Sequence, residues 1–132
     1  MITKFQFFLL FFVLGVYSSY AKDPVPTRVT FNNDWRFFLG DDSKAKNVQY
    51  EDSKWRALNL PHDWSIEGVF SESNPAKPAG AALPTGIGWY RKSFNLPASS
   101  RDKKIYIEFD GVYRNSEVWI NGHYLGKRPN GY

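Results

Sequence analysis

The 132-residue sequence predicts an all-β fold, a β-sandwich or a barrel, and three observations support this prediction. Apolar and polar residues alternate over 105–109 and again over 118–120, which is the period of a strand with one buried face. Asn121-Gly122 follows the second run, and Asn-Gly between alternating runs is the strongest short signal for a β-hairpin. No segment carries a convincing amphipathic helical pattern, and no internal repeat is present.

Residues 1–21 are predicted to be a secretory signal peptide, which leaves 22–132 as the mature domain. A positively charged start precedes an apolar run over 5–16, and the small residues Ser19 and Ala21 suit a cleavage site before position 22. A membrane anchor is the alternative, but the run is shorter than the roughly 20 residues of a spanning helix. We therefore expect an exported protein, periplasmic or extracellular, with no membrane contact in its mature form.

The strands of the mature part are recognised by their β-branched and aromatic residues, and the connections by Gly, Pro, Asn, Asp and Ser. In chain order, the expected strands and extended segments are 28–31, 35–39, 50–60 and 87–96. The charged stretch 40–47 has no apolar period and is expected to be a loop. A second loop, 68–86, is rich in Gly, Pro, Ser and Asn. A loop of that length in a compact domain is usually functional or disordered.

The stretch 103–126 is expected to organise the domain, because it contains the clearest strand pattern and the Asn-Gly turn. Its apolar residues on the alternating positions are the strongest candidates for the core. These candidates are Ile105, Ile107, Phe109, Val118 and Ile120.

The composition excludes several classes of site. The sequence has no cysteine, so disulfides, cysteine ligands and a cysteine nucleophile are excluded. The net charge of +4 comes from scattered residues rather than a dense basic block, so nucleic-acid binding is not expected. Aromatic residues make up 18% of the chain, which suits a sandwich core or a sugar-contacting surface. Trp64, Trp89 and Trp119 could stack on sugars, although core packing is the favoured interpretation for each.

Two pairs of polar residues are candidates for acid–base chemistry. His62 and Asp63 are adjacent in an extended segment, where neighbours point to opposite faces, so a structural role in bonding loop backbone is favoured. Glu108 and Asp110 share one side of a predicted strand at roughly 7 Å, a separation that paired glycosidase carboxyls can have. A solvent-facing position is nevertheless the favoured interpretation for both. No cluster has metal-ligand spacing, so no metal is expected.

Several motifs then occur in a specific order and spacing. They are Trp35-Arg36-Phe37, Trp55 with Leu60 to Trp64, Gly86 to Phe94, Phe109 to Val112, and Val118 to Gly122. In this order the chain resembles the N-terminal sugar-binding domain of glycoside hydrolase family 2, the family of β-galactosidases, β-glucuronidases and β-mannosidases. The resemblance covers nearly all of the mature part, about 31–132.

The resemblance implies a jelly-roll β-sandwich of the galactose-binding type. It also implies a secreted glycosidase that hydrolyses terminal β-glycosidic bonds, most readily a β-galactosidase, with a β-galactoside or related glycoside as its ligand and no cofactor. The two catalytic glutamates of the family lie on a downstream (β/α)₈ barrel and have no counterpart here. By the same resemblance, Asn130 stands where β-galactosidases place a sugar-contacting Asp, and Asn74 is a second sugar contact.

We expect the chain to be an N-terminal fragment whose sandwich is incomplete at its C-terminal end and whose partners are the downstream domains of the same enzyme. The principal alternative is a stand-alone carbohydrate-binding module without catalysis, which would close its own sandwich. A third possibility is a small hydrolase that uses Glu108 and Asp110.

Overall fold

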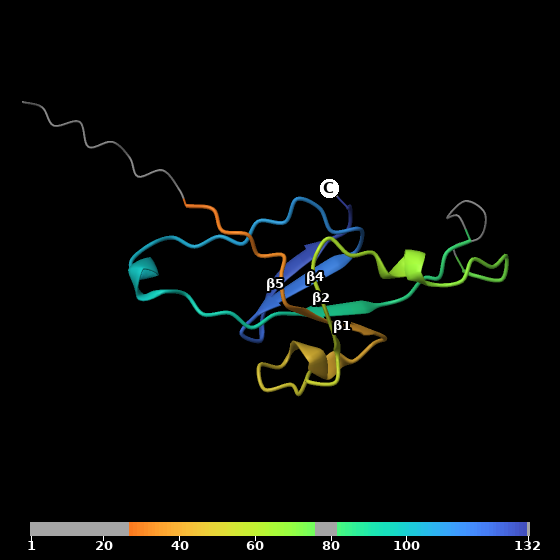
Figure 1. The fold of residues 1–132 in the computed structure, drawn as a ribbon, viewed down its shortest axis with the longest axis horizontal. Coiled ribbons are helices and arrows are strands. Elements are labelled where there is room, and N and C mark those ends of the chain that lie inside the picture. The colour runs from red at the N-terminus through yellow and green to blue at the C-terminus, as the bar shows by residue number, and fades with distance from the viewer. Residues whose placement is uncertain (1–26, 76–81, 132) are drawn as a thin grey trace, which may run out of the picture.

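The computed structural model describes residues 27–75 and 82–131, so the predicted signal peptide lies outside the described residues. Within these ranges the protein consists of short antiparallel strands, 3-10 turns and connecting loops, with no α-helix (Figure 1). The strands form a three-stranded sheet and a two-stranded hairpin. The all-β prediction is therefore confirmed. No helix in the described ranges is long and apolar enough to cross a membrane.

The three-stranded sheet has β1 at its centre, in the order β2-β1-β3. Its strands are β1 (Trp35–Leu39), β2 (Arg56–Leu58) and β3 (Gly88–Arg91). Both outer strands run antiparallel to β1, with Phe37 opposite Arg56 on one side and opposite Tyr90 on the other. β1 has the predicted bounds, whereas β2 and β3 are shorter than the extended segments that the sequence predicts around them.

Successive side chains of β1 point to opposite faces of the sheet, and different residues cover the two faces. On one face Trp35 and Phe37 are 8% and 6% exposed. On the other face Phe38 stacks on Trp55, with ring centroids 5.3 Å apart. Trp55 belongs to the segment between β1 and β2, in which Tyr50 also packs on it with ring centroids 5.3 Å apart and Ala45 is 1% exposed. The buried hydrophobic residues of the described chain thus come from β1 and the segment that follows it.

The predicted hairpin is present as β4 (Ser116–Ile120) and β5 (His123–Arg128). Asn121 and Gly122 have φ angles of 49° and 79°, the positive values that both central residues of a type I′ turn require. The hairpin contacts the larger sheet through Trp119, whose ring centroid lies 5.4 Å from that of Trp89 on β3. The Asn-Gly prediction is therefore confirmed, and the turn chemistry accounts for it.

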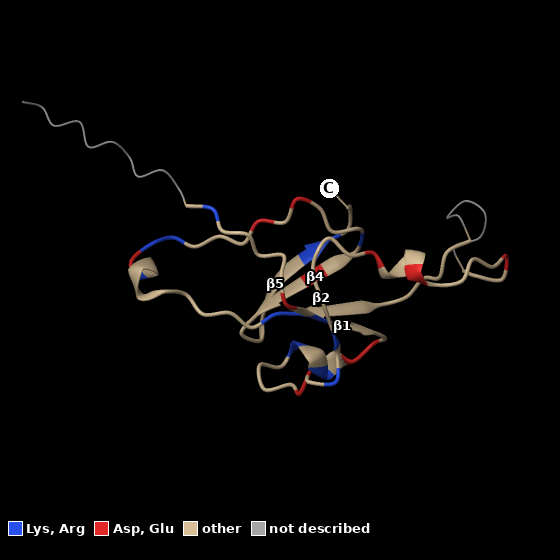
Figure 2. Cartoon of the chain, viewed as in Figure 1, with Lys and Arg blue, Asp and Glu red and all other residues tan. Residues whose placement is uncertain are grey.

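Three 3-10 turns complete the secondary structure of the described residues: η1 (Ser43–Lys46), η2 (Trp64–Glu67) and η4 (Ala98–Ser100). The first two begin at an aspartate whose side chain accepts a hydrogen bond from a backbone N–H of the turn. Such capping satisfies donors that the turn itself leaves unpaired. Lys and Arg are interspersed with Asp and Glu over strands and loops (Figure 2).

Two predictions about strands and core are wrong. Residues 28–31 form no strand. Ile105, Ile107 and Phe109 also lie outside any strand and are 47%, 39% and 45% exposed. The alternation is present, but among the described residues no neighbouring strand pairs with this segment, and a strand is stable only in a ladder. Val118 and Ile120 are half-buried.

Phe37 and Phe38 offer a matched pair of substitutions on opposite faces of β1. Phe37→Ala should lower the free energy of unfolding by about 3–5 kcal/mol, because it removes a ring that is 6% exposed and leaves a cavity. Phe38→Ala should cost clearly less, since Phe38 is 37% exposed. Urea unfolding of the two variants measures the difference. Equal losses of unfolding free energy in the two variants would contradict the prediction that the Phe37 face of β1 is the more deeply buried one.

Candidate functional site

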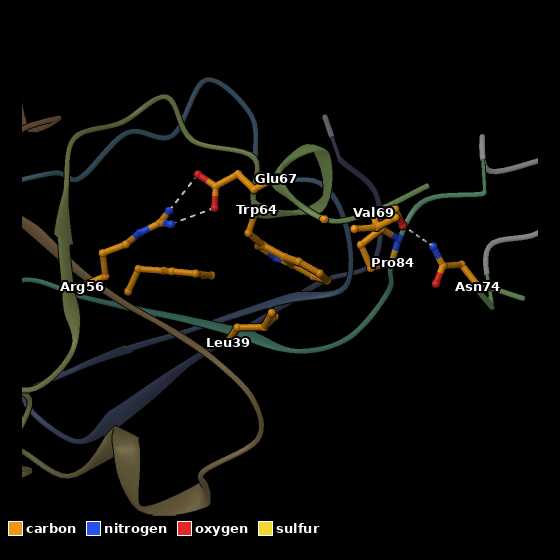
Figure 3. Close-up of a pocket in the computed structure, with 9 residues that line it drawn as sticks. Leu39, Arg56, Trp64, Glu67, Val69, Asn74 and Pro84 are labelled. Atoms are coloured by element: carbon orange, nitrogen blue, oxygen red, sulfur yellow. Dashed lines mark hydrogen bonds and ion pairs between the residues drawn. The ribbon is translucent and has the colours of Figure 1, made fainter. Parts of the chain in front are cut away.

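A pocket of about 510 Å³ lies between β1, η2 and the loop that follows η2. It has an ion pair at one end, an indole in the middle and an amide at the other end (Figure 3). The lining residues are Phe37, Leu39, Arg56, Trp64, Glu67, Gly68, Val69, Asn74 and Pro84. This volume falls within the range of small-molecule sites, and an apolar lining with a few polar groups is typical of them.

Trp64 is placed by its local sequence and by a glycine on β3. The carboxylate of Asp63 accepts hydrogen bonds from Ser65 N (3.0 Å) and Ser65 Oγ (2.6 Å), which starts η2 at Trp64. A β-carbon at position 88 would lie 2.9 Å from Trp64 Nε1 and 3.1 Å from a ring carbon of Phe37. Only glycine permits this close approach. Gly88 therefore lets the indole lie against the sheet.

Arg56 and Glu67 form a bidentate ion pair at the edge of the pocket (Figure 3). Arg56 Nη1 donates to Glu67 Oε2 at 2.8 Å, and Nη2 donates to Oε1 at 2.9 Å. The hydrogen bonds from Arg56 lower the pKa of Glu67, with a further lowering from His62. Both side chains are nearly half exposed, so water screens the pair, and the planar fork chiefly supplies a defined geometry.

His62 links this ion pair to the sheet. His62 Nε2 lies 2.5 Å from Arg56 Nη2 and 3.2 Å from Glu67 Oε1, so one ring nitrogen contacts both members of the pair. The other ring nitrogen, Nδ1, lies 2.8 Å from the Tyr90 hydroxyl. Burial raises the pKa of Tyr90 to about 12, so the phenol stays protonated. Asp63 bonds loop backbone by capping η2, as predicted, whereas His62 bonds the side chains of Arg56 and Tyr90 rather than loop backbone.

Asn74 holds the loop at the far end of the pocket. Its Nδ2 donates to the carbonyl oxygens of Val69 (2.8 Å) and Ala82 (2.7 Å), and Ser71 N donates to Ala82 O (3.2 Å). Both amide hydrogens are therefore used inside the loop. Oδ1 is the atom of this side chain that can accept a hydrogen bond from a ligand. The predicted role of Asn74 as a sugar contact stays a prediction.

Asn130 lies elsewhere. It is exposed, just after β5, between Pro129 and Gly131, whose carbonyl oxygens accept hydrogen bonds from Asn115 N (3.3 Å) and Val112 N (3.2 Å). It is not among the pocket residues. The structure thus places one of the two predicted sugar contacts at the pocket and the other near the end of the hairpin. Sugar binding by Asn130 also stays a prediction.

The remaining candidates are not brought together into a site. Glu108 and Asp110 are exposed, and Glu108 forms an ion pair with Arg28 at 3.2 Å. Trp89 and Trp119 pack on each other, and of the three candidate tryptophans Trp64 lines the pocket. Over 27–75 and 82–131, no group of three or more potential ligands could hold a metal ion.

Sequence reasoning missed the contacts of Arg56 with Glu67 and of His62 with Tyr90. Arg56 and Glu67 are eleven positions apart, and Tyr90 is 28 positions from His62. No local pattern predicts such contacts, because they depend on the pairing of β1 with both outer strands. A signal was available for Trp64, which lies in one of the quoted motifs.

The sequence matches the family described as glycosyl hydrolases family 2, sugar binding domain, over residues 29–132. The chain belongs to this family. A β-galactosidase of Bacteroides ovatus is 53% identical over 119 residues, which cover 90% of this chain and 14% of that protein. A putative β-glucuronidase of Formosa agariphila is 46% identical over 113 residues, which cover 86% of this chain and 11% of that protein.

Solved structures of glycosidases agree with this assignment. A β-glycosidase from Bacteroides vulgatus superposes with a TM-score of 0.77 at 54% identity, over 79% of this chain and 14% of that one. A family 2 member from Bacteroides cellulosilyticus superposes with a TM-score of 0.76 at 36% identity. The two antiparallel sheets and these family 2 neighbours support the predicted sandwich fold. The chain spans between a ninth and a seventh of the length of the relatives named here.

The Arg56–Glu67 pair predicts a specific acid dependence. Because the pKa of Glu67 is lower in the folded protein than in the unfolded chain, its contribution to stability is present above about pH 4.5 and is lost as the pH falls further. Glu67→Gln should therefore weaken the dependence of Tm on pH between about 5 and 3. Glu72→Gln is the control, since no ion pair of Glu72 is found in the described part of the chain. If Tm depended on pH identically in the wild type and in Glu67→Gln, the stabilising role assigned to the ionised Glu67 would be contradicted.

Proposed function

We propose that this chain is the sugar-binding domain of a family 2 glycoside hydrolase that hydrolyses terminal β-glycosidic bonds, and that the enzyme is a β-galactosidase. The observation that carries this proposal is the family match over 29–132 together with 53% identity to a β-galactosidase. The family resemblance implies that the catalytic carboxylates lie in a downstream domain, and Glu108 and Asp110 of this chain are exposed. The domain contributes to sugar recognition.

The chemistry of the pocket supports a carbohydrate as its ligand. A sugar ring presents an apolar face and a rim of hydroxyls, and the pocket offers the Trp64 indole with polar groups at both ends. Arg56 supplies donors, Glu67 supplies acceptors, and Asn74 Oδ1 supplies a further acceptor. Asn130 is the second proposed contact, at the rim formed by the end of the hairpin.

The observations on charge favour the same class of ligand. Lys and Arg are interspersed with acidic residues, rather than forming the continuous basic surface of a nucleic-acid-binding protein (Figure 2).

We infer that the protein is exported, periplasmic or extracellular, on the basis of the apolar run over 5–16 and the small residues before Lys22.

A panel of nitrophenyl glycosides tested on the full-length protein checks the activity. We expect hydrolysis of the β-galactoside at a kcat/KM at least about 10-fold above the other sugars, a ratio worth about 1.4 kcal/mol of transition-state discrimination. Hydrolysis of the β-glucuronide instead would support the proposed glycosidase activity but would show that the substrate is a β-glucuronide rather than a β-galactoside. Binding of glycosides without hydrolysis of any would favour the stand-alone carbohydrate-binding module.

Asn130 can be tested in the same assay. Asn130→Ala should raise KM about 2–10-fold, the cost of one hydrogen bond to a hydroxyl, whereas Asn130→Asp keeps an acceptor and should change KM less. The exposed Asn33, in the turn before β1, provides the control variant Asn33→Ala. Unchanged kinetics for Asn130→Ala would remove this residue from the sugar site.

The proposed export has its own test. Expression of the full-length protein with its leader in a bacterial host should give a secreted or periplasmic product whose N-terminal sequence begins at Lys22. A product in the cytoplasm that retains the leader would contradict this proposal.

A further inference from the structure

Two side chains of opposite charge line the pocket. Arg56 and Glu67 are the charged residues among its described lining residues. A uronic acid carries a carboxylate where the corresponding neutral sugar carries a hydroxymethyl group. An ionised carboxylate can only accept hydrogen bonds, whereas a hydroxyl both donates and accepts them. Discrimination between these two classes of sugar therefore depends on which donors the lining leaves available.

Both bidentate faces of the Arg56 guanidinium are in contact with other side chains. At the outer face, Nη1 donates to Glu67 Oε2 at 2.8 Å and Nη2 donates to Oε1 at 2.9 Å (Figure 3). The side face is formed by Nε and Nη2, and Nη2 lies 2.5 Å from His62 Nε2. A guanidinium binds a carboxylate most strongly through two parallel N–H groups. A ligand carboxylate therefore has to displace Glu67 or His62 to bind Arg56 in this way.

The orientation of Arg56 is set by its neighbours. Its guanidinium lies over the Phe37 ring, 5.2 Å from the centroid. The His62 side chain beside it is 10% exposed, and the His62 ring lies 4.9 Å from that of Phe37. A turn of the guanidinium towards a ligand would remove these contacts together with the ion pair. We therefore expect Arg56 to keep this orientation when a sugar binds.

Glu67 brings a negative charge to the edge of the pocket. It is the last residue of η2, and Gly68 N donates to Ser65 O (3.3 Å) where this turn ends. The hydrogen bonds from Arg56 lower the pKa of Glu67, so its carboxylate is ionised at neutral pH. A ligand carboxylate that approaches Arg56 would meet this like charge, and the juxtaposition of like charges weakens binding.

The other end of the pocket also suits hydroxyls better than a carboxylate. The amide nitrogen of Asn74 donates to the carbonyl oxygens of Val69 and Ala82, which uses both of its hydrogens. Oδ1 is left as an acceptor. A hydroxyl can donate to Oδ1, whereas a carboxylate has no hydrogen to donate.

We propose that Glu67 is a specificity-determining residue, which makes the pocket accept neutral sugars and exclude uronic acids. It does so by occupying the outer face of Arg56 and by its own negative charge. This inference rests on the proposed function in one respect, namely that the pocket binds a sugar. Removal of the charge of Glu67 would leave Arg56 as an uncompensated cation beside the bound ring, and the preference would shift towards the acidic sugar.

Galactose and galacturonic acid are a matched pair of ligands for the test. They differ only at C6, and neither has a glycosidic bond that the full-length enzyme could hydrolyse. Isothermal titration calorimetry at pH 7 should give the wild type a Kd for galactose at least about 10-fold below that for galacturonate. Glu67→Gln keeps the shape of the side chain and removes its charge. This variant should bind galacturonate about 10-fold more tightly than the wild type does, and its Kd for galactose should change less than about 3-fold.

Two further variants show whether the effect comes from the charge and passes through Arg56. Glu67→Asp retains the charge and should still exclude galacturonate. Adding Arg56→Met to Glu67→Gln removes the cation and should abolish the gain in galacturonate affinity. Persistence of that gain in the double variant would overturn the proposal, as would a gain of the same size in Glu67→Asp.

Glu72→Gln is the control, because it removes an exposed carboxylate that is not among the pocket residues. Both Kd values should stay as in the wild type. The wild type provides a test that needs no variant, since equal affinity for the two sugars would overturn the proposal. Failure of the wild type to bind galactose would also overturn it.

The glycoside panel separates this inference from the proposed function. Hydrolysis of the β-galactoside together with an unchanged sugar preference in Glu67→Gln would leave the enzyme proposal standing and remove the role of Glu67. The expected shift in preference, in a protein without glycosidase activity, would support the role of Glu67 and remove the enzyme proposal.

Discussion

The burial of Phe37 is the interaction on which the rest of the structure depends. Its ring lies 4.9 Å from the rings of both His62 and Tyr90, and the guanidinium of Arg56 lies over it at 5.2 Å. These neighbours come from β2, β3 and the segment before η2, so one side chain of the central strand joins all of them. The bidentate pair of Arg56 with a glutamate, and hence one end of the pocket, takes its position from this contact.

The pocket and the hairpin lie against opposite sides of the same three-stranded sheet. Trp64 reaches the pocket because Gly88 has no side chain, whereas Trp89, the next residue of β3, points to the opposite face and meets Trp119. Strand alternation therefore places two neighbouring residues of β3 against different parts of the chain. On one side of the sheet Trp64 lines the pocket, and on the other side Trp89 joins the hairpin to the sheet.

The family resemblance predicts two sugar contacts, and the structure shows where each of these side chains lies and what it already binds. Asn74 and Asn130 were identified by their places in the order of motifs, and that order is confirmed by the family match. The structure adds that the amide hydrogens of Asn74 already bind Val69 and Ala82, which limits this residue to accepting from a ligand. The spacing of residues in the sequence could not have shown where these two side chains lie or which hydrogen bonds they already form.

The sequence by itself determined the features that depend on local chemistry: the all-β class, the turn at Asn121-Gly122, the central strand Trp35–Leu39 and the family. Only the tertiary structure decided which apolar residues are buried. Ile105 has the pattern of a core residue, yet it is 47% exposed because no described strand pairs with its segment. Alternation predicts how a strand would orient its side chains, but burial requires a partner, and the partner is set by pairing between residues far apart in the chain.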